Sequence, residues 1–289
     1  LQHIPTGEPW PLDELNLRRA EIESHGLSWD VIESIPLHND IKTRTGDYQR
    51  CINNYKTSIR NAGSAGVSVV CYNFMPVIDW TRTDLAYKLK TGAYALRFDQ
   101  TKFAVFDLFI LQRAGSDADY TETEIREARE AYQQMSSEER EQLTDNIISG
   151  LPGKMTGSYS LDDFKNAMAQ YRYIGHAELR DNLDRFLSHV LPKAEQLGVK
   201  LAIHPDDPPR DMFGLPRIIC TANDLDRLFA QQPSSSNGIT LCVGTYGSRA
   251  DNDLPAMARR FGSRINFAHL RGVSRDKNEQ RSFYEANHL

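Results

Sequence analysis

The sequence lacks the features that mark several classes of protein. No apolar run approaches the roughly 20 residues that a membrane-spanning helix needs, and no secretory signal is visible. Basic residues are not in excess, with 34 Lys and Arg against 39 Asp and Glu, and a net charge of −5 gives no general attraction to nucleic acids or anionic membranes. The four cysteines show no Cys-x-x-Cys spacing, which argues against a disulfide framework and fits a reducing compartment. We therefore expect a cytoplasmic protein that binds neither nucleic acid nor membrane.

The composition is that of an ordinary globular protein. Its 289 residues are 40% hydrophobic and 25% charged, which is enough apolar material for a large core. No internal repeat, low-complexity tract or dividing linker interrupts it. We expect one domain over residues 1–289.

Three short apolar runs in the last third of the chain each end at a side chain that can bind a metal ion. Residues 199–203 precede His204, residues 239–241 precede Cys242, and residues 265–268 precede His269. Such runs are typical of buried strands in a parallel sheet, and the segments between them are long enough for crossover helices. Imidazole and thiolate are good ligands for first-row divalent metals. Each residue alone could be a core residue, but the repeated position favours a metal site.

The N-terminal part of the chain has the same alternation of strand and helix. Strands are predicted at 29–35 and 67–74, and helices at 11–24 and 48–62, which is the pattern of a parallel sheet. Polar residues follow the second strand, among them Asn73 and Arg82. Asn73 could simply bond a neighbouring backbone group, and Arg82 could form a surface ion pair.

Residues 83–176 are longer than a crossover requires, and they read as a helical insertion. A small hairpin is predicted near residues 88–96, followed by an apolar helix at 98–111. Ser or Thr with an acidic residue three positions later predicts helix starts at Thr121, Ser136 and Ser160. Leu151-Pro-Gly is expected to end one of these helices.

Long motifs along the chain carry a resemblance to a known family. They are His3-Ile-Pro, Glu33-Ser-Ile-Pro, Cys71-Tyr-Asn-Phe-Met-Pro, Asp79-Trp-Thr-Arg-Thr-Asp-Leu and Ala95-Leu-Arg-Phe-Asp. With these motifs the sequence resembles the mannonate dehydratases of hexuronate breakdown. The resemblance implies an α/β fold, a TIM (β/α)8 barrel of the xylose-isomerase-like type, with the insertion after its third strand. It also implies one barrel strand before Leu1 and two after Leu289.

The resemblance further implies a reaction and a set of site residues. The reaction is the dehydration of D-mannonate to 2-keto-3-deoxy-D-gluconate, with Mn²⁺ or Fe²⁺ on His204, Cys242 and His269, because N and S ligands are too soft for Mg²⁺. A homodimer is expected. Candidate substrate-binding residues are Asn73, Arg82, Asp206, Asp207, Arg249, Asp251 and Arg271. The acid–base His and Tyr of the family lie beyond Leu289, so no catalytic residue is assigned.

Some of these roles have alternatives. Asp206 and Asp207 stand beside prolines and could equally shape a turn. A metal-dependent sugar isomerase on the same barrel is a second candidate function, although such enzymes usually use carboxylate ligands, and Cys242 argues against it. A catalytically inactive protein that binds sugar acids is the third.

Overall fold

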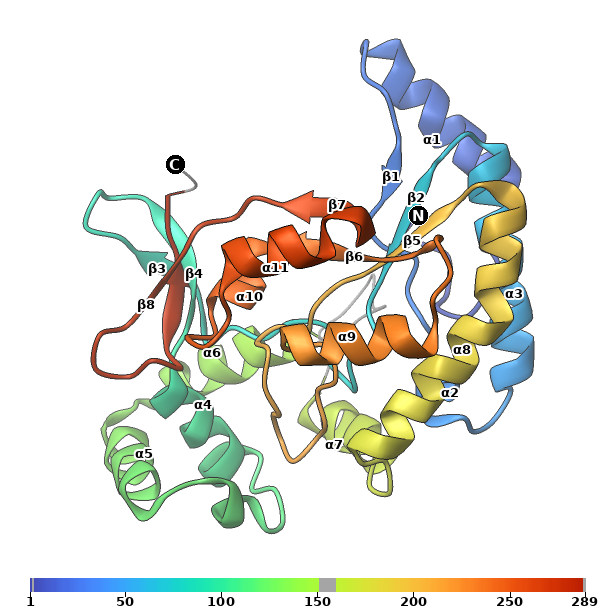
Figure 1. The fold of residues 1–289 in the computed structure, drawn as a ribbon. Helices are drawn as coiled ribbons and strands as arrows, with labels where there is room; N and C mark the ends of the chain where they lie inside the picture. The colour runs from blue at the N-terminus through green and yellow to red at the C-terminus, as the bar shows by residue number, and fades with distance from the viewer. Residues whose placement is uncertain (2, 151–159, 288–289) are drawn as a thin grey trace.

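A curled parallel sheet forms one half of the structure, a computed structural model that describes residues 1, 3–150 and 160–287 (Figure 1). Its five strands are all parallel, and their order in the sheet follows their order in the chain. The strands are β1 (Val31–Ile32), β2 (Val69–Tyr72), β5 (Lys200–Ile203), β6 (Asn237–Cys242) and β7 (Ile265–His269). All five predicted parallel strands are thereby confirmed, with shifted ends.

The curl of this sheet brings residues from non-adjacent strands together. Neighbouring strands lie about 4.8 Å apart, so β5 and β7 are roughly twice that distance from each other. Nevertheless the rings of His204 and His269 have centroids only 5.3 Å apart. Thr240 on β6 likewise approaches Cys71 on β2, with 3.5 Å between oxygen and sulfur. Among the described residues the sheet has the five strands that the sequence predicts and does not close, so the structure shows a parallel half-barrel.

Helices cover the outer face of the parallel sheet. Tyr55 of α3 and Phe186 of α8 meet edge to face at 5.2 Å, and Tyr72 of β2 lies 5.8 Å from the same phenylalanine. Apolar side chains from these elements form the first of two cores. The helices of this half are α1 (Leu12–Ser24), α2 (Asn39–Thr43), α3 (Tyr48–Ser64), α8 (His176–Leu197), α9 (Ala222–Gln231), α10 (Val243–Gly247) and α11 (Leu254–Phe261).

The second half contains an antiparallel sheet as well as the helices predicted for residues 83–176. The predicted hairpin is present, as β3 (Asp84–Lys88) and β4 (Tyr94–Phe98). Two further strands, β8 (Val273–Arg275) and β9 (Phe283–Glu285), extend it in the order β3-β4-β9-β8. Because β9 pairs with a strand far earlier in the chain, no local pattern predicts this sheet.

The helices of this half pack around a second, aromatic core. Phe213 meets Phe103, Phe106 and Phe164 at centroid distances of 4.6, 5.9 and 5.1 Å. The predicted helix at 98–111 begins two residues late and changes to a π-helix midway. The three predicted capping boxes are present, and the expected break at residues 151–153 lies outside the described residues. The elements are α4 (Gln100–Val105), η1 (Phe106–Ile110), η2 (Ser116–Asp119), α5 (Glu122–Gln134), α6 (Ser137–Ile148) and α7 (Leu161–Ala169).

The helices of the described residues fall short of the requirements for a membrane-spanning segment. None of the helices in the described ranges combines the length and the apolar character needed to cross a bilayer.

Candidate metal centre and cavity

Three side chains meet at the carboxyl edge of the parallel sheet. His204 follows β5, while Cys242 ends β6 and His269 ends β7, where the two residues are directly paired. One ligand atom from each lies within 4.8 Å of the other two. The edge that holds them is the usual place for sites in parallel sheets.

His204 is oriented by the chain that follows it. Its Nδ1 lies 2.8 Å from the carbonyl oxygen of Pro205, which can only accept, so Nδ1 carries the proton and donates. In the neutral ring this leaves Nε2 with a free lone pair. Histidine ligands are commonly fixed in this way by a bond from the other ring nitrogen.

The electrostatics of the cluster favour a thiolate. Burial alone would raise the pKa of Cys242, but hydrogen bonds with His204 and His269 and the positive charge of Arg271 lower that pKa to about 5. The pKa of His269 rises to about 9 because it bonds to Cys242 and then to Glu33, whose carboxylate lies 2.9 Å from Nε2. A thiolate beside two imidazoles is a set of donors that fits a divalent transition metal.

A cavity of about 370 Å³ opens beside this cluster, which is large enough for a small ligand. His204 and His269 form part of its wall, and so do three of the predicted substrate-binding residues from elsewhere in the chain, Asn73, Arg82 and Arg271. Asp207 also lines it. The structure therefore brings residues from both halves of the molecule to one polar cavity.

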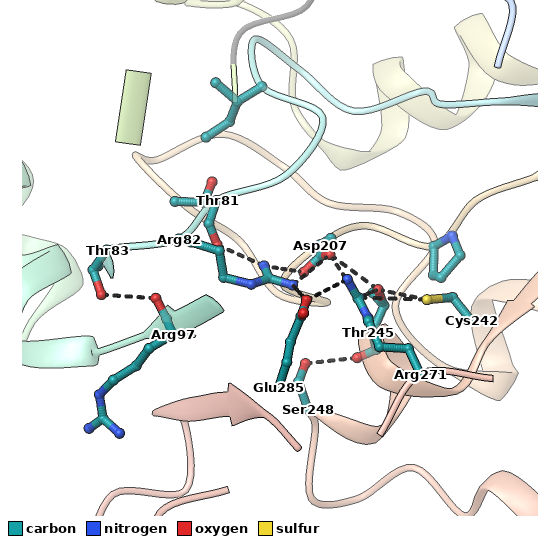
Figure 2. A network of polar contacts seen from close by, with 12 residues as sticks. Thr81, Arg82, Thr83, Arg97, Asp207, Cys242, Thr245, Ser248, Arg271 and Glu285 are labelled. Carbon is teal, nitrogen blue, oxygen red and sulfur yellow. Dashed lines mark hydrogen bonds and ion pairs between the residues drawn. The ribbon is translucent and has the colours of Figure 1, made fainter. Parts of the chain in front are cut away.

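Asp207 is the centre of a buried ionic network in this wall. Figure 2 shows Arg82 and Arg271 converging on its carboxylate. Arg82 donates twice, at 2.8 Å to Oδ1 and 3.1 Å to Oδ2, and Arg271 donates at 3.3 Å to Oδ2. Burial alone would raise the pKa of Asp207, but the charges of both arginines hold it well below its usual range.

Thr245 and Glu285 complete the network. The short helix α10 turns the chain back after Cys242, which places the Thr245 hydroxyl 3.2 Å from the Cys242 sulfur and 3.2 Å from Asp207 Oδ2. Glu285 on β9 accepts a hydrogen bond of 2.9 Å from Arg271. With four donors around it, the Asp207 carboxylate holds other protein groups in place and is poorly available to a substrate.

The remaining predicted residues do not line this cavity. Asp206 is buried and accepts hydrogen bonds of 2.7 Å from the backbone N–H groups of Ile218 and Ile219, so it fixes the loop. Arg249 and Asp251 form an exposed pair with each other at 2.6 Å. In this structure, therefore, three of the seven candidates face structural partners outside the cavity.

Sequence reasoning assigned no role to several residues that contact the site, among them Glu33, Thr245 and Glu285. Glu33 stands at the end of a predicted strand, so its place on the same edge was a usable signal. Thr245 lies three residues after a ligand, at the spacing of one helical turn, but the helix was not predicted. Glu285 belongs to an unpredicted strand and left no signal.

A second group of metal-binding side chains is explained by local structure. His38, Asp40 and Cys51 also offer ligand atoms within 4.8 Å of one another. His38, however, caps α2 by accepting the backbone N–H of Asp40 at 3.2 Å, and the Asp40 carboxylate accepts the N–H of Asp47 at 2.9 Å. Cys51 is buried in the first core. We assign no metal to this group.

Comparisons with known proteins agree on one family. The sequence matches the family described as D-mannonate dehydratase (UxuA) over residues 1–289. Mannonate dehydratases from Saccharophagus degradans and Marinomonas sp. are 51% and 50% identical to it across the whole chain, which covers 72% and 73% of their lengths. The crystal structure of mannonate dehydratase from Streptococcus suis serotype 2 superposes with a TM-score of 0.74 at 36% identity, over 99% of this chain and 68% of that one.

Proposed function

The chain belongs to the D-mannonate dehydratase family, and from this we propose that His204, Cys242 and His269 hold the divalent metal ion of a D-mannonate dehydratase. The protein dehydrates D-mannonate. Its relatives of about 50% identity carry the name mannonate dehydratase. The observation that carries the metal assignment is the convergence of three ligand atoms within 4.8 Å at the wall of a polar cavity. The isomerase and the inactive binding protein are not favoured.

The reaction removes a proton from C2 and a hydroxyl group from C3 of the sugar acid. A divalent metal ion supplies Lewis acidity for the negative charge that develops when the C2 proton leaves. Residues of this chain hold the proposed metal ligands in position. His204 and His269 lie at the cavity wall with their rings fixed by Pro205 and Glu33.

We assign binding of the substrate carboxylate to Arg271 in the cavity wall. Arg271 lines the cavity and is only partly buried, so its charge can attract a carboxylate. Asp207, Thr245 and Glu285 hold its guanidinium in one orientation. We propose that Asn73 and Arg82 contribute to the same wall, whereas Asp206, Arg249 and Asp251 would act on the substrate only through the loops that they stabilise.

We propose Mn²⁺ or Fe²⁺ as the bound ion. The mixed N and S donors support a first-row transition metal over Mg²⁺. Zn²⁺ also suits this set. Activity of metal-free protein reconstituted with each ion separately decides between them, and equal activity with Mg²⁺ would contradict the assignment.

The metal site is tested directly with Cys242→Ser. Metal content of the purified variant, measured by mass spectrometry, is expected to fall, with affinity lowered by about 100-fold or more, since changes even in outer-shell partners cost 10–100-fold. Cys220→Ser is the matched control, because this buried thiol lies outside the cluster. Unchanged metal affinity in Cys242→Ser would reject the site.

Three broader features complete the proposal. We propose that the curled sheet forms part of an eight-stranded barrel, which is supported by the convergence of side chains from β5 and β7. A homodimer in the cytoplasm is the assembly implied by the family resemblance. Sedimentation velocity of the purified protein tests the dimer, and a monomer at micromolar concentration would contradict it.

A further inference from the structure

Asp79 lines the cavity, and its Oδ1 atom accepts no hydrogen bond from any residue that the structure describes. Among the described residues, three carboxylates line the cavity, namely those of Glu33, Asp79 and Asp207. Glu33 is paired with His269 and Asp207 is saturated by its donors. The Oδ1 atom of Asp79 is covered by the protein and accepts no hydrogen bond from the described residues, and the Lys42 ammonium is 3.8 Å away. The side chain as a whole is 19% exposed and lines the cavity, so a ligand can reach the part of Asp79 that faces the cavity.

The loop that carries Asp79 is held in place by groups that have no contact with the metal cluster. Two buried cations and a helix end bind its backbone. The bonds run from Lys42 Nζ to the Met75 carbonyl at 2.8 Å, from Arg217 Nη1 to the Ile78 carbonyl at 3.1 Å, and from the Asp79 N–H to the Gly150 carbonyl at 3.1 Å. Asp79 is therefore presented from a rigid support, as a recognition residue requires.

The conformation of this loop is also a strained one. Val77 has a φ of +66°, which is a clear outlier for a β-branched residue. Gly150 packs so closely on the loop that a side chain there would clash with the carbonyl oxygen of Trp80. Strained backbone persists where its surroundings over-determine it, and it clusters at ligand sites. The strain thus supports a binding role for the residues that follow Val77.

We propose that Asp79 recognises the sugar acid by accepting hydrogen bonds from hydroxyl groups of its polyol chain. This inference rests on the proposed function, because it takes D-mannonate as the ligand of the cavity. Hydroxyl groups supply the donors that the Asp79 carboxylate lacks, and the buried Lys42 provides a positive charge beside it. A site that bonds a substrate hydroxyl discriminates strongly against analogues without it. Asp79 is then a specificity-determining residue, distinct from the groups around the metal.

The test compares Asp79→Asn with Asp226→Asn. The control removes a carboxylate that pairs with Arg260 on the surface, away from the cavity. Steady-state kinetics are measured with D-mannonate and with its 4-, 5- and 6-deoxy analogues. Asp79→Asn is expected to raise KM for D-mannonate by about tenfold or more, because hydrogen bonds to charged groups are strong. Its kcat should change much less, and its preference for D-mannonate over one deoxy analogue should largely disappear.

Each other outcome overturns the inference. Unchanged KM and unchanged discrimination would mean that Asp79 does not touch the substrate. A collapse of kcat at constant KM would make Asp79 a proton-transfer group. If Asp79→Asn does not fold, Asp79→Glu takes its place, because it keeps the charge beside Lys42 but moves the oxygens, and it should show the same loss of discrimination.

Calorimetry separates this inference from the metal assignment. D-mannonate is titrated into metal-free wild type and metal-free Asp79→Asn, so that neither turnover nor metal contributes to the signal. Weaker binding in the variant supports the role of Asp79 even if Cys242→Ser keeps its metal. Equal binding in both proteins refutes it even if the metal assignment holds.

Discussion

The two sheets of this protein contribute to the same site in different ways. The parallel sheet supplies His204, Cys242 and His269 from strands that are consecutive in the chain and adjacent in space. The antiparallel sheet supplies Glu285 from β9, which pairs with β4 across most of the sequence. A repeated strand-and-ligand pattern can be recognised locally, whereas a partner brought in by a distant strand cannot. The proposed metal ligands are thus easier to find in the sequence than the residues that orient the groups around them.

Asp207 is a residue at which the two halves meet. It follows β5 of the parallel sheet, yet it holds Arg82, which leads into the antiparallel sheet, and Arg271, which bonds in turn to Glu285 (Figure 2). The network is buried, so each charge in it depends on its partners. Breaking it one residue at a time measures how strongly the two regions depend on each other.

Asp207→Asn is expected to have the largest effect of these variants. It removes the carboxylate that accepts two hydrogen bonds from the buried Arg82 guanidinium and leaves only Glu285, 3.8 Å away, as a carboxylate partner among the described residues, and breaking such a buried pair costs about 3–5 kcal/mol of stability. Urea denaturation followed by circular dichroism measures it. Asp226→Asn, which breaks an exposed pair, should cost about 1 kcal/mol or less. Similar midpoints for the two variants would show that the halves are not joined through Asp207.

The pH dependence of this effect has a defined sign. Because the pKa of Asp207 is lowered in the folded protein, its contribution to the free energy of unfolding is complete above the unfolded pKa of about 3.9. It is lost as the pH falls further toward the folded pKa. The stability difference between wild type and Asp207→Asn should therefore be constant above about pH 5 and shrink below about pH 4.

Arg271→Lys tests the link between the network and the reaction. Lysine keeps the charge but not the fork of donors that reaches Asp207, Thr245 and Glu285. We expect kcat/KM for D-mannonate to fall by about tenfold or more, since misplaced groups at an active site are costly. Arg260→Lys, at a surface ion pair, is the control and should be near wild type. Wild-type kinetics for Arg271→Lys would remove this residue from the binding wall.

Glu285→Gln is expected to have the smallest effect. Glutamine retains one acceptor for Arg271, so the orientation of the guanidinium should loosen without being lost. A decrease in kcat/KM of about threefold is expected, well under the 10–100-fold that loss of an important outer-shell partner costs. A larger decrease than that of Arg271→Lys would mean that the antiparallel sheet has a more direct role than positioning.

The strands of the parallel sheet and their order could be predicted from the sequence. The five apolar runs and the helices between them are local patterns, and the structure places them as parallel neighbours in the expected order. The ends of those strands then indicated His204, Cys242 and His269, which the structure brings within 4.8 Å of one another. The candidates from loops were less informative, because Asp206 and Arg249 are charged residues that turned out to bond to the loops themselves.

For this protein, the alternation of short apolar runs and amphipathic helices is enough to specify a parallel α/β sheet with three side chains at one edge that can bind a metal, because strand period and burial are properties of neighbouring residues. Tertiary structure alone decides which carboxylates are already surrounded by hydrogen-bond donors. Asp207 and Asp79 cannot be told apart in the sequence, yet among the described residues Asp207 accepts several hydrogen bonds, whereas Asp79 Oδ1 accepts none and has only the Lys42 ammonium 3.8 Å away. That difference depends on distances between segments far apart in the chain, and it separates a residue that holds the site together from the one that we propose binds the substrate.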